Sequence, residues 1–247
     1  MKTTLLLIII FIISVNYSFA DFKKIKKKAI VNNPEIIFPI PKNLEKCITK
    51  MYIDPQMNLV KPILKVKAPK GYGLDDRFDN ALDKFSNFSR PCGGGNREAC
   101  ENVKRIILEW AKADAAKRTG PSDHEGRHWN DTLTVNLYIA SPMLAAYSFV
   151  KQVVDVPIEE DQIIKKWFMK IVKKNKHLMY DQIYKKNTQA IGVPKRAHNH
   201  ALSSAIAHME LGVLLNDEKL FRKTFKNFEA AIKYQRKDGS LPIEVRR

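Results

Sequence analysis

From Ala99 onward, apolar side chains recur at the spacing of α-helices, and this periodicity constrains the fold more than any other feature of the chain. It predicts five helical stretches, near residues 99–111, 130–150, 163–172, 202–213 and 220–232. Pro142 should kink or break the second stretch, and Asn216 or Asp217 is placed to cap the last one. No strand-like alternation competes with this pattern. The sequence therefore predicts an all-α fold of antiparallel helical hairpins joined by short polar loops.

The first twenty residues have the pattern of a secretory signal peptide. Lys2 gives a positive start, an apolar run follows from Leu5 to Ile13, and the small-x-small end is Ser18-Phe19-Ala20. The alternative is an uncleaved anchor, but the apolar run is short for a bilayer and no later stretch is long and apolar enough to cross one. We expect residues 1–20 to be removed on export to the periplasm or the medium, with no stable membrane insertion.

Two further regions follow the predicted signal peptide. Residues 21–90 begin with a stretch rich in lysine and proline, and we expect an extended N-terminal arm there that could act as a lid. Residues 91–247 carry the helical periodicity and are expected to form the helical domain.

The formal net charge of +17 favours an anionic partner. Nucleic acid, anionic lipid and acidic polysaccharide are the three classes that fit, although diffuse lysines are usually no more than a solvated surface. Export argues against nucleic acid as the main partner, and anionic lipid and acidic polysaccharide both stay open on charge alone.

Three cysteines occur in the chain. In an oxidising compartment Cys92 and Cys100 could close a small loop around three glycines, but Cys47 leaves the pairing open. No Cys-x-x-Cys pair or glycine-rich phosphate loop occurs, so neither a zinc ribbon nor a nucleotide cofactor is predicted.

His198-Asn199-His200 stands at the start of the fourth predicted helix. A helix N-terminus offers free N–H groups and a partial positive charge, both suited to an anion. Asn199 could donate a hydrogen bond to a carboxylate, and His200 could do the same or act as a base. The plainer alternative is that Asn199 caps the helix and the histidines lie at its solvated edge. The histidine spacing does not suit a metal, so no metal site is predicted.

The last ten residues form a second motif. Asp238-Gly239-Ser240-Leu241-Pro242 is a turn, and Glu244 and Arg247 follow with a spacing that places them on one helix face. Glu244 could orient an arginine, whose planar fork grips a carboxylate with two hydrogen bonds. The alternative is an ordinary surface ion pair.

On these two motifs the chain resembles the alginate lyase family, helical polysaccharide lyases that act on uronate chains. The family pattern Asn-Asn-His is matched by His198-Asn199-His200, and the pattern Asp-Gly-x-x-Pro-x-Glu-x-x-Arg by Asp238 through Arg247. The helix end at residues 108–114 also looks like the Trp-Ala helix of the family. The resemblance covers residues 90–247 and implies an α/α toroid, which would be incomplete here.

The resemblance also implies roles for individual residues. Asn199, His200 and Arg247 would be catalytic, and His198 and Arg246 would contact the substrate. In the family a tyrosine follows the arginine by about two helical turns, and the sequence ends at Arg247. We therefore expect a C-terminally truncated member of the family.

Three departures from the family pattern bear on activity. His198 replaces the first asparagine, and Ala201 and Leu202 replace aromatic residues. If residues 1–247 are active alone, Tyr72 and Tyr138 are the first candidates to replace the missing tyrosine.

The expected reaction is β-elimination on a uronate polymer, poly-mannuronate alginate first, by a monomer without a cofactor. Neutralising the uronate carboxylate makes the neighbouring C5 proton removable, after which the bond to O4 breaks. No paired acidic motif favours glycoside hydrolysis instead. The main alternative is a non-catalytic exported protein that binds anionic polysaccharide, and an exported nucleic-acid binder is a third.

Overall fold

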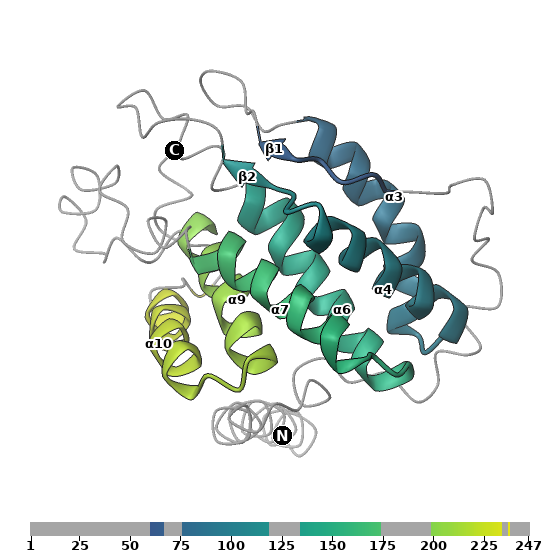
Figure 1. Cartoon of the computed structure of the whole chain (residues 1–247). Helices are drawn as coiled ribbons and strands as arrows, with labels where there is room; N and C mark the ends of the chain where they lie inside the picture. Colours follow the sequence, from purple (N-terminus) through teal and green to yellow (C-terminus); the bar gives the residue numbers. More distant parts are fainter. Residues whose placement is uncertain (1–59, 67–75, 119–133, 174–198, 234–236, 238–247) are drawn as a thin grey trace, which may run out of the picture.

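The structure, a computed structural model, describes residues 60–66, 76–118, 134–173, 199–233 and 237 (Figure 1). In chain order its elements are β1 (Lys65–Val66), α3 (Asp76–Gly93), α4 (Arg97–Lys112), β2 (Lys117–Arg118), the π-helix η2 (Thr134–Ala140), α6 (Ser141–Val153), α7 (Ile158–Lys173), α9 (Asn199–Leu214) and α10 (Glu218–Lys233). The five predicted helical stretches are confirmed as α4, η2 with α6, α7, α9 and α10. The predicted all-α class is also confirmed.

The extended arm expected over residues 21–90 is wrong for its last part, because residues 76–90 belong to α3. Phe78, Phe85 and Phe88 recur along this stretch at helical spacing and are all buried. Their burial drives the helix despite the prolines and lysines that precede it. Residues 21–59 of the expected arm lie outside the described residues.

A short parallel pairing of two strands was not predicted. Lys65 lies opposite Lys117, and Val66 lies opposite Arg118. This pairing joins the segment before α3 to the segment after α4, and so closes the open end of the α3–α4 hairpin. Two residues per strand leave no room for the alternation by which strands are recognised in a sequence.

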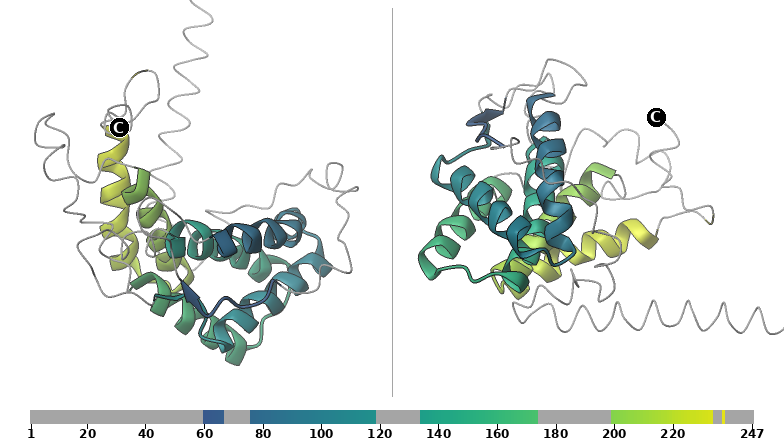
Figure 2. Two further views of the ribbon diagram at one scale, coloured as in Figure 1. Left: turned by 90° about the horizontal axis from the view of Figure 1, so that it is seen from above. Right: turned by 90° about the vertical axis from the view of Figure 1, so that its right-hand side faces the viewer.

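The helices fall into two groups in space. Helices α3, α4, α6 and α7 pack together, and the α9–α10 hairpin lies crosswise at one end of them (Figures 1 and 2). Aromatic side chains fill the larger group: the ring of Trp110 meets Phe78 at 6.2 Å and Trp167 at 6.5 Å between centroids, both edge to face. Such aromatic contacts stabilise a core beyond the area that they bury.

Both of these tryptophans also donate a hydrogen bond. Trp110 Nε1 donates to the carbonyl of Val60 at 2.9 Å, and Trp167 Nε1 donates to the carbonyl of Ala115 at 3.0 Å. The chain around Ala115 turns sharply, with Asp114 at φ 50° and Ala116 at φ 60°. The indole hydrogen bonds thus hold two irregular segments against the ends of α4 and α7.

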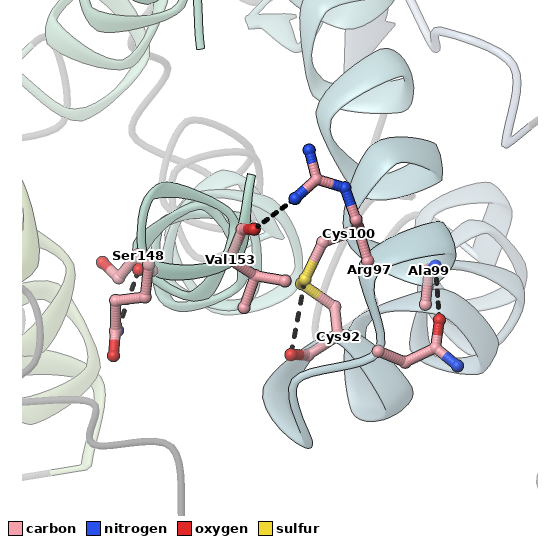
Figure 3. The surroundings of a disulfide bond; sticks show 8 residues. Cys92, Arg97, Ala99, Cys100, Ser148 and Val153 are labelled. Atoms are coloured by element: carbon pink, nitrogen blue, oxygen red, sulfur yellow. Dashed lines mark hydrogen bonds between the residues drawn. A yellow bond between two sulfur atoms is a disulfide. The ribbon is translucent and has the colours of Figure 1, made fainter. Parts of the chain in front are cut away.

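A disulfide joins Cys92 near the end of α3 to Cys100 in the first turns of α4 (Figure 3). The pairing that the sequence left open is therefore formed. Gly95, in the turn between the helices, takes φ 88°, a conformation that glycine adopts without strain. Asn96 caps α4, since its side-chain oxygen accepts from the amide of Ala99 at 2.9 Å.

The kink or break predicted at Pro142 is found as a change of helix type. The wide turns of η2 end at Ala140, whose backbone is itself helical, and α6 continues directly from Ser141 with the proline in its first turn. A predicted cap is confirmed as well: Asp217 Oδ1 accepts from the amide of Leu220 at 2.9 Å. Asn216 takes φ 53° and closes the turn between α9 and α10.

Candidate active site

Asn199 and His200 are the first two residues of α9. The structure therefore confirms that this pair opens a helix, although their side chains lie outside its described part. His198, Arg246 and Arg247 also lie outside the described residues. The meeting of these five side chains in one site stays a prediction.

The position of α9 is fixed by packing on two of its sides. Ala207 and Leu211 face the main core, whereas Val213 packs in a separate small cluster with Phe221 and Phe225 of α10. A helix buried on both sides cannot rotate without breaking one of the two contacts. The start of α9 therefore has a defined direction.

The first turn of α9 suits an anion. The first amides of any α-helix lack acceptors within the helix, and they carry its partial positive charge. The first turn of α9 holds no acidic residue that would offset that charge. A carboxylate group of a substrate would be stabilised there by the backbone as well as by side chains.

Glu210, near the far end of α9, is the only buried acidic side chain among the described residues. Its Oε1 accepts a hydrogen bond from Ser141 Oγ at 3.2 Å, and its Oε2 has no hydrogen-bond partner within the described structure. Burial raises the pKa of Glu210 well above its ordinary value, and the hydrogen bond from Ser141 opposes this only partly. Glu210 was not predicted from the sequence as a residue of interest. The available signal was a single acidic residue within the apolar run 205–215.

His208 lies inside the protein and is held by its own helix. Its Nδ1 lies 2.7 Å from the carbonyl oxygen of Ser204, one turn earlier, and the residue is fully buried. Among the described residues, no three side chains of the metal-binding types are grouped so as to hold an ion.

Three tyrosines bear on which residue could donate a proton. Tyr138 of η2 is partly buried against the main core, and Tyr72 lies outside the described residues. Tyr147 is buried and donates to Asp161 Oδ1 at 2.8 Å. Burial and this hydrogen bond both raise the pKa of Tyr147, so it is a structural residue and a poor acid.

Basic side chains gather where β1, β2 and the end of α7 meet. Lys117 and Lys170 both pair with Asp114, the former at 2.7 Å, while Lys65 lies opposite Lys117 in the strand pair. Burial opposes ionisation of Asp114, but hydrogen bonds from the two lysines outweigh it and lower its pKa. Among the described residues, one carboxylate thus lies between two lysine ammonium groups at this point.

A model of the alginate lyase family matches residues 94–247 of the chain. The chain belongs to the alginate lyase family. The matched range includes α4, η2, α6, α7, α9 and α10, together with both sequence motifs. The resemblance inferred from those motifs is thereby confirmed.

Similar proteins agree with the family match. An alginate lyase of Pseudomonas syringae pv. tomato (strain ATCC BAA-871 / DC3000) is 28% identical over 159 residues, which are 62% of this chain and 37% of that protein. The crystal structure of alginate lyase A1-III from Sphingomonas species A1 superposes with a TM-score of 0.56 at 15% identity, over 88% of this chain and 64% of that one. A structure of alginate lyase A1-III complexed with a tetrasaccharide gives a TM-score of 0.55 at 13% identity, with the same coverage.

These superpositions assign the fold. The helical hairpins are part of an α/α toroid, as the resemblance implied. The chain spans about a third of the length of the curated alginate lyase that it matches, and about two thirds of the solved structures. Among the described helices, none is both long and apolar enough to cross a bilayer.

Proposed function

We propose that the protein is a polysaccharide lyase that cleaves an anionic uronate polymer by β-elimination, with poly-mannuronate alginate as the first candidate substrate. The observation that carries the proposal is the family match over residues 94–247, within which Asn199 and His200 open α9. All three matches named above are called alginate lyases, and one of them is complexed with a tetrasaccharide.

The chemistry assigns a role to each residue of the site. Asn199 and Arg247, together with the first amides of α9, neutralise the uronate carboxylate and so stabilise the negative charge that develops when C5 loses its proton. His200 removes that proton as the general base, and its ordinary pKa suits this task near neutral pH. His198 and Arg246 hold neighbouring sugar carboxylates. The reaction ends when the bond from C4 to the glycosidic oxygen breaks. That oxygen leaves as a hydroxyl with a proton from protonated His200 or from water, and a double bond between C4 and C5 remains in the sugar.

The setting of the enzyme follows from the same features. Residues 1–20 direct export, so the protein works in the periplasm or outside the cell, as a monomer. Its charge of +17 attracts a polyanion and raises the encounter rate at low salt.

The test is to add the protein to poly-mannuronate, to poly-guluronate and to a neutral polysaccharide, and to follow the ultraviolet absorbance of the unsaturated product. We expect a rise with a uronate polymer and none with the neutral one. His200→Gln and Asn199→Asp should each reduce the rate by about 10²–10⁴-fold. Asn102→Asp, the same change on the outer side of α4, should leave it unchanged.

A second outcome would support a different function. His198 stands where the family pattern has an asparagine, which favours a non-catalytic protein that binds the polymer. Binding of poly-mannuronate without any unsaturated product, from any uronate polymer tested, would reject the lyase and support this alternative.

A further inference from the structure

The buried carboxyl group of Glu210 is energetically unfavourable, because burying such a group costs several kilocalories per mole unless it is fully hydrogen-bonded. Glu210 is buried among the apolar contacts of α9, and only one of its two carboxyl oxygens has a partner among the described residues. An apolar side chain of similar size would fill the same space at a lower cost. The presence of the acid therefore points to a role other than stability.

The single partner of Glu210 lies at a particular place in the fold. Ser141 is the first residue of α6, directly after the π-helix η2, and it is 69 residues from Glu210 in the chain. Wide π-helical turns are rare and are frequent near functional sites. The hydrogen bond from Ser141 Oγ to Glu210 Oε1 thus ties α9 to the junction of η2 and α6.

Glu210 is also in register with the start of its own helix. It follows Asn199 by 210 − 199 = 11 residues, which is about three helical turns. The Cα atoms of the two residues therefore lie on the same side of α9, roughly 16 Å apart along its axis. A rotation of α9 that broke the hydrogen bond to Ser141 would turn Asn199 and His200 by the same angle.

We propose that Glu210 is a positioning residue, which holds α9 against the η2–α6 junction through Ser141 and so sets the direction in which Asn199 and His200 face the substrate. This inference rests on the proposed lyase function for its catalytic consequence. The structural part of it, the orientation of the start of α9, does not depend on any activity.

Three variants of the full chain separate positioning from stability. Glu210→Met removes the hydrogen bond and keeps the volume, so the variant should be as stable as the wild type or more so. Glu210→Gln keeps an oxygen that accepts from Ser141. Ser141→Ala removes the donor, and its matched control is Ser148→Ala, because the Ser148 hydroxyl bonds within α6 to the carbonyl of Leu144.

The first readout is the rate of cleavage of poly-mannuronate, with kcat and KM measured separately. We expect Glu210→Met and Ser141→Ala to lower kcat by roughly ten- to a hundredfold, with little change in KM. Glu210→Met should not lower the melting temperature, whereas Ser141→Ala should lower it, because both carboxyl oxygens of Glu210 then lack a partner among the described residues. Glu210→Gln should restore most of kcat, and Ser148→Ala should not change it. The proposal would be overturned if Glu210→Met kept the full kcat. It would also be overturned if kcat fell only as much as the fraction of folded protein fell.

The second readout works even if the protein cleaves no polysaccharide. Nuclear magnetic resonance signals of the His200 ring, assigned by comparison with His200→Gln, report its surroundings directly. They should shift in Glu210→Met and Ser141→Ala, and stay in place in Glu210→Gln and Ser148→Ala. Unchanged His200 signals in all four variants would reject the positioning role, whereas shifted signals in a protein without lyase activity would reject only the proposed function.

Discussion

Gly212 of α9 stands directly against the backbone of Phe221 on α10. A Cβ atom added to Gly212 would lie 2.9 Å from the Phe221 amide nitrogen and 3.1 Å from its Cα. Carbon atoms do not approach backbone atoms that closely without displacement. The absence of a side chain at this position therefore sets how near the two helices come to each other.

Gly212→Ala should lower the free energy of unfolding by about 1–2 kcal/mol. Alanine favours a helix over glycine by up to about 1 kcal/mol, but here the added methyl group must push α10 away, and overpacking of this kind costs roughly 1–3 kcal/mol. Denaturation by urea measures the change. Gly93→Ala is the control, because its Cβ would meet the ring of Phe149 at 3.3 Å, and a side chain can yield. A Gly212→Ala protein at least as stable as the wild type would show that the hairpin can open without cost.

Loss of the disulfide should destabilise the protein by about 2–3 kcal/mol. Cys92 and Cys100 are 8 residues apart, and closing a loop of that length restricts the unfolded chain by about this amount. Replacing both cysteines with alanine, followed by urea denaturation under oxidising conditions, tests the value. Cys47→Ala should behave like the wild type. Equal stability of the double variant and the wild type would contradict the prediction.

Asp161 should make the protein lose stability at acidic pH. Burial opposes its ionisation, but hydrogen bonds from Lys165 and Tyr147 and the charge of Lys151 outweigh burial and lower its pKa. A carboxyl whose pKa is lower in the folded state contributes stability above its unfolded pKa of about 3.9, and this contribution disappears as the pH falls through the folded pKa.

Asp161→Asn should therefore be less stable than the wild type at neutral pH, and the difference should shrink below about pH 4. Thermal melts from pH 3 to 7 measure it, with the exposed Asp155→Asn as the control. If the difference in melting temperature between Asp161→Asn and the wild type stayed constant from pH 3 to 7, the charge of Asp161 would contribute nothing to stability.

Glu210 should have the opposite effect on stability. Its pKa is raised by burial, so its contribution is complete below the unfolded pKa of about 4.3 and is lost as the pH rises through the folded pKa. Glu210→Gln cannot ionise, and it should gain stability relative to the wild type as the pH rises above the unfolded pKa of about 4.3. If the stability of Glu210→Gln and that of the wild type changed with pH in the same way, the Glu210 carboxyl would have to be exposed to water.

The helices could be predicted where each one buries a single apolar face. In α4, for example, Val103, Ile106 and Ile107 recur at helical spacing and all three are buried. The helix α3 was missed because its burial comes from a few spaced phenylalanines within a region dominated by charge and proline. The π-helix has no pattern of its own in the sequence, and only Pro142 marked where it ends.

The candidate site could be predicted only in part, for a physical reason. Asn199 and His200 were recognisable because they open a helix, which is a local property of the chain. The burial of Glu210 depends on Ser141, which comes 69 residues earlier, and on the way in which α9 crosses α6. No local pattern in the sequence encodes that crossing.

The α3–α4 hairpin is closed at both ends, by the Cys92–Cys100 disulfide at its turn and by the β1–β2 pairing at its open end. In the described structure, α9 and α10 are joined by a short turn, and they pack on each other through Val213, Phe221 and Phe225. Backbone amides of α3 and α4 should therefore exchange with deuterium only when the whole domain unfolds, whereas those of α9 exchange through smaller openings. The exchange rates of the α9 amides would thus report how firmly the helix that begins with Asn199 and His200 is held against the core.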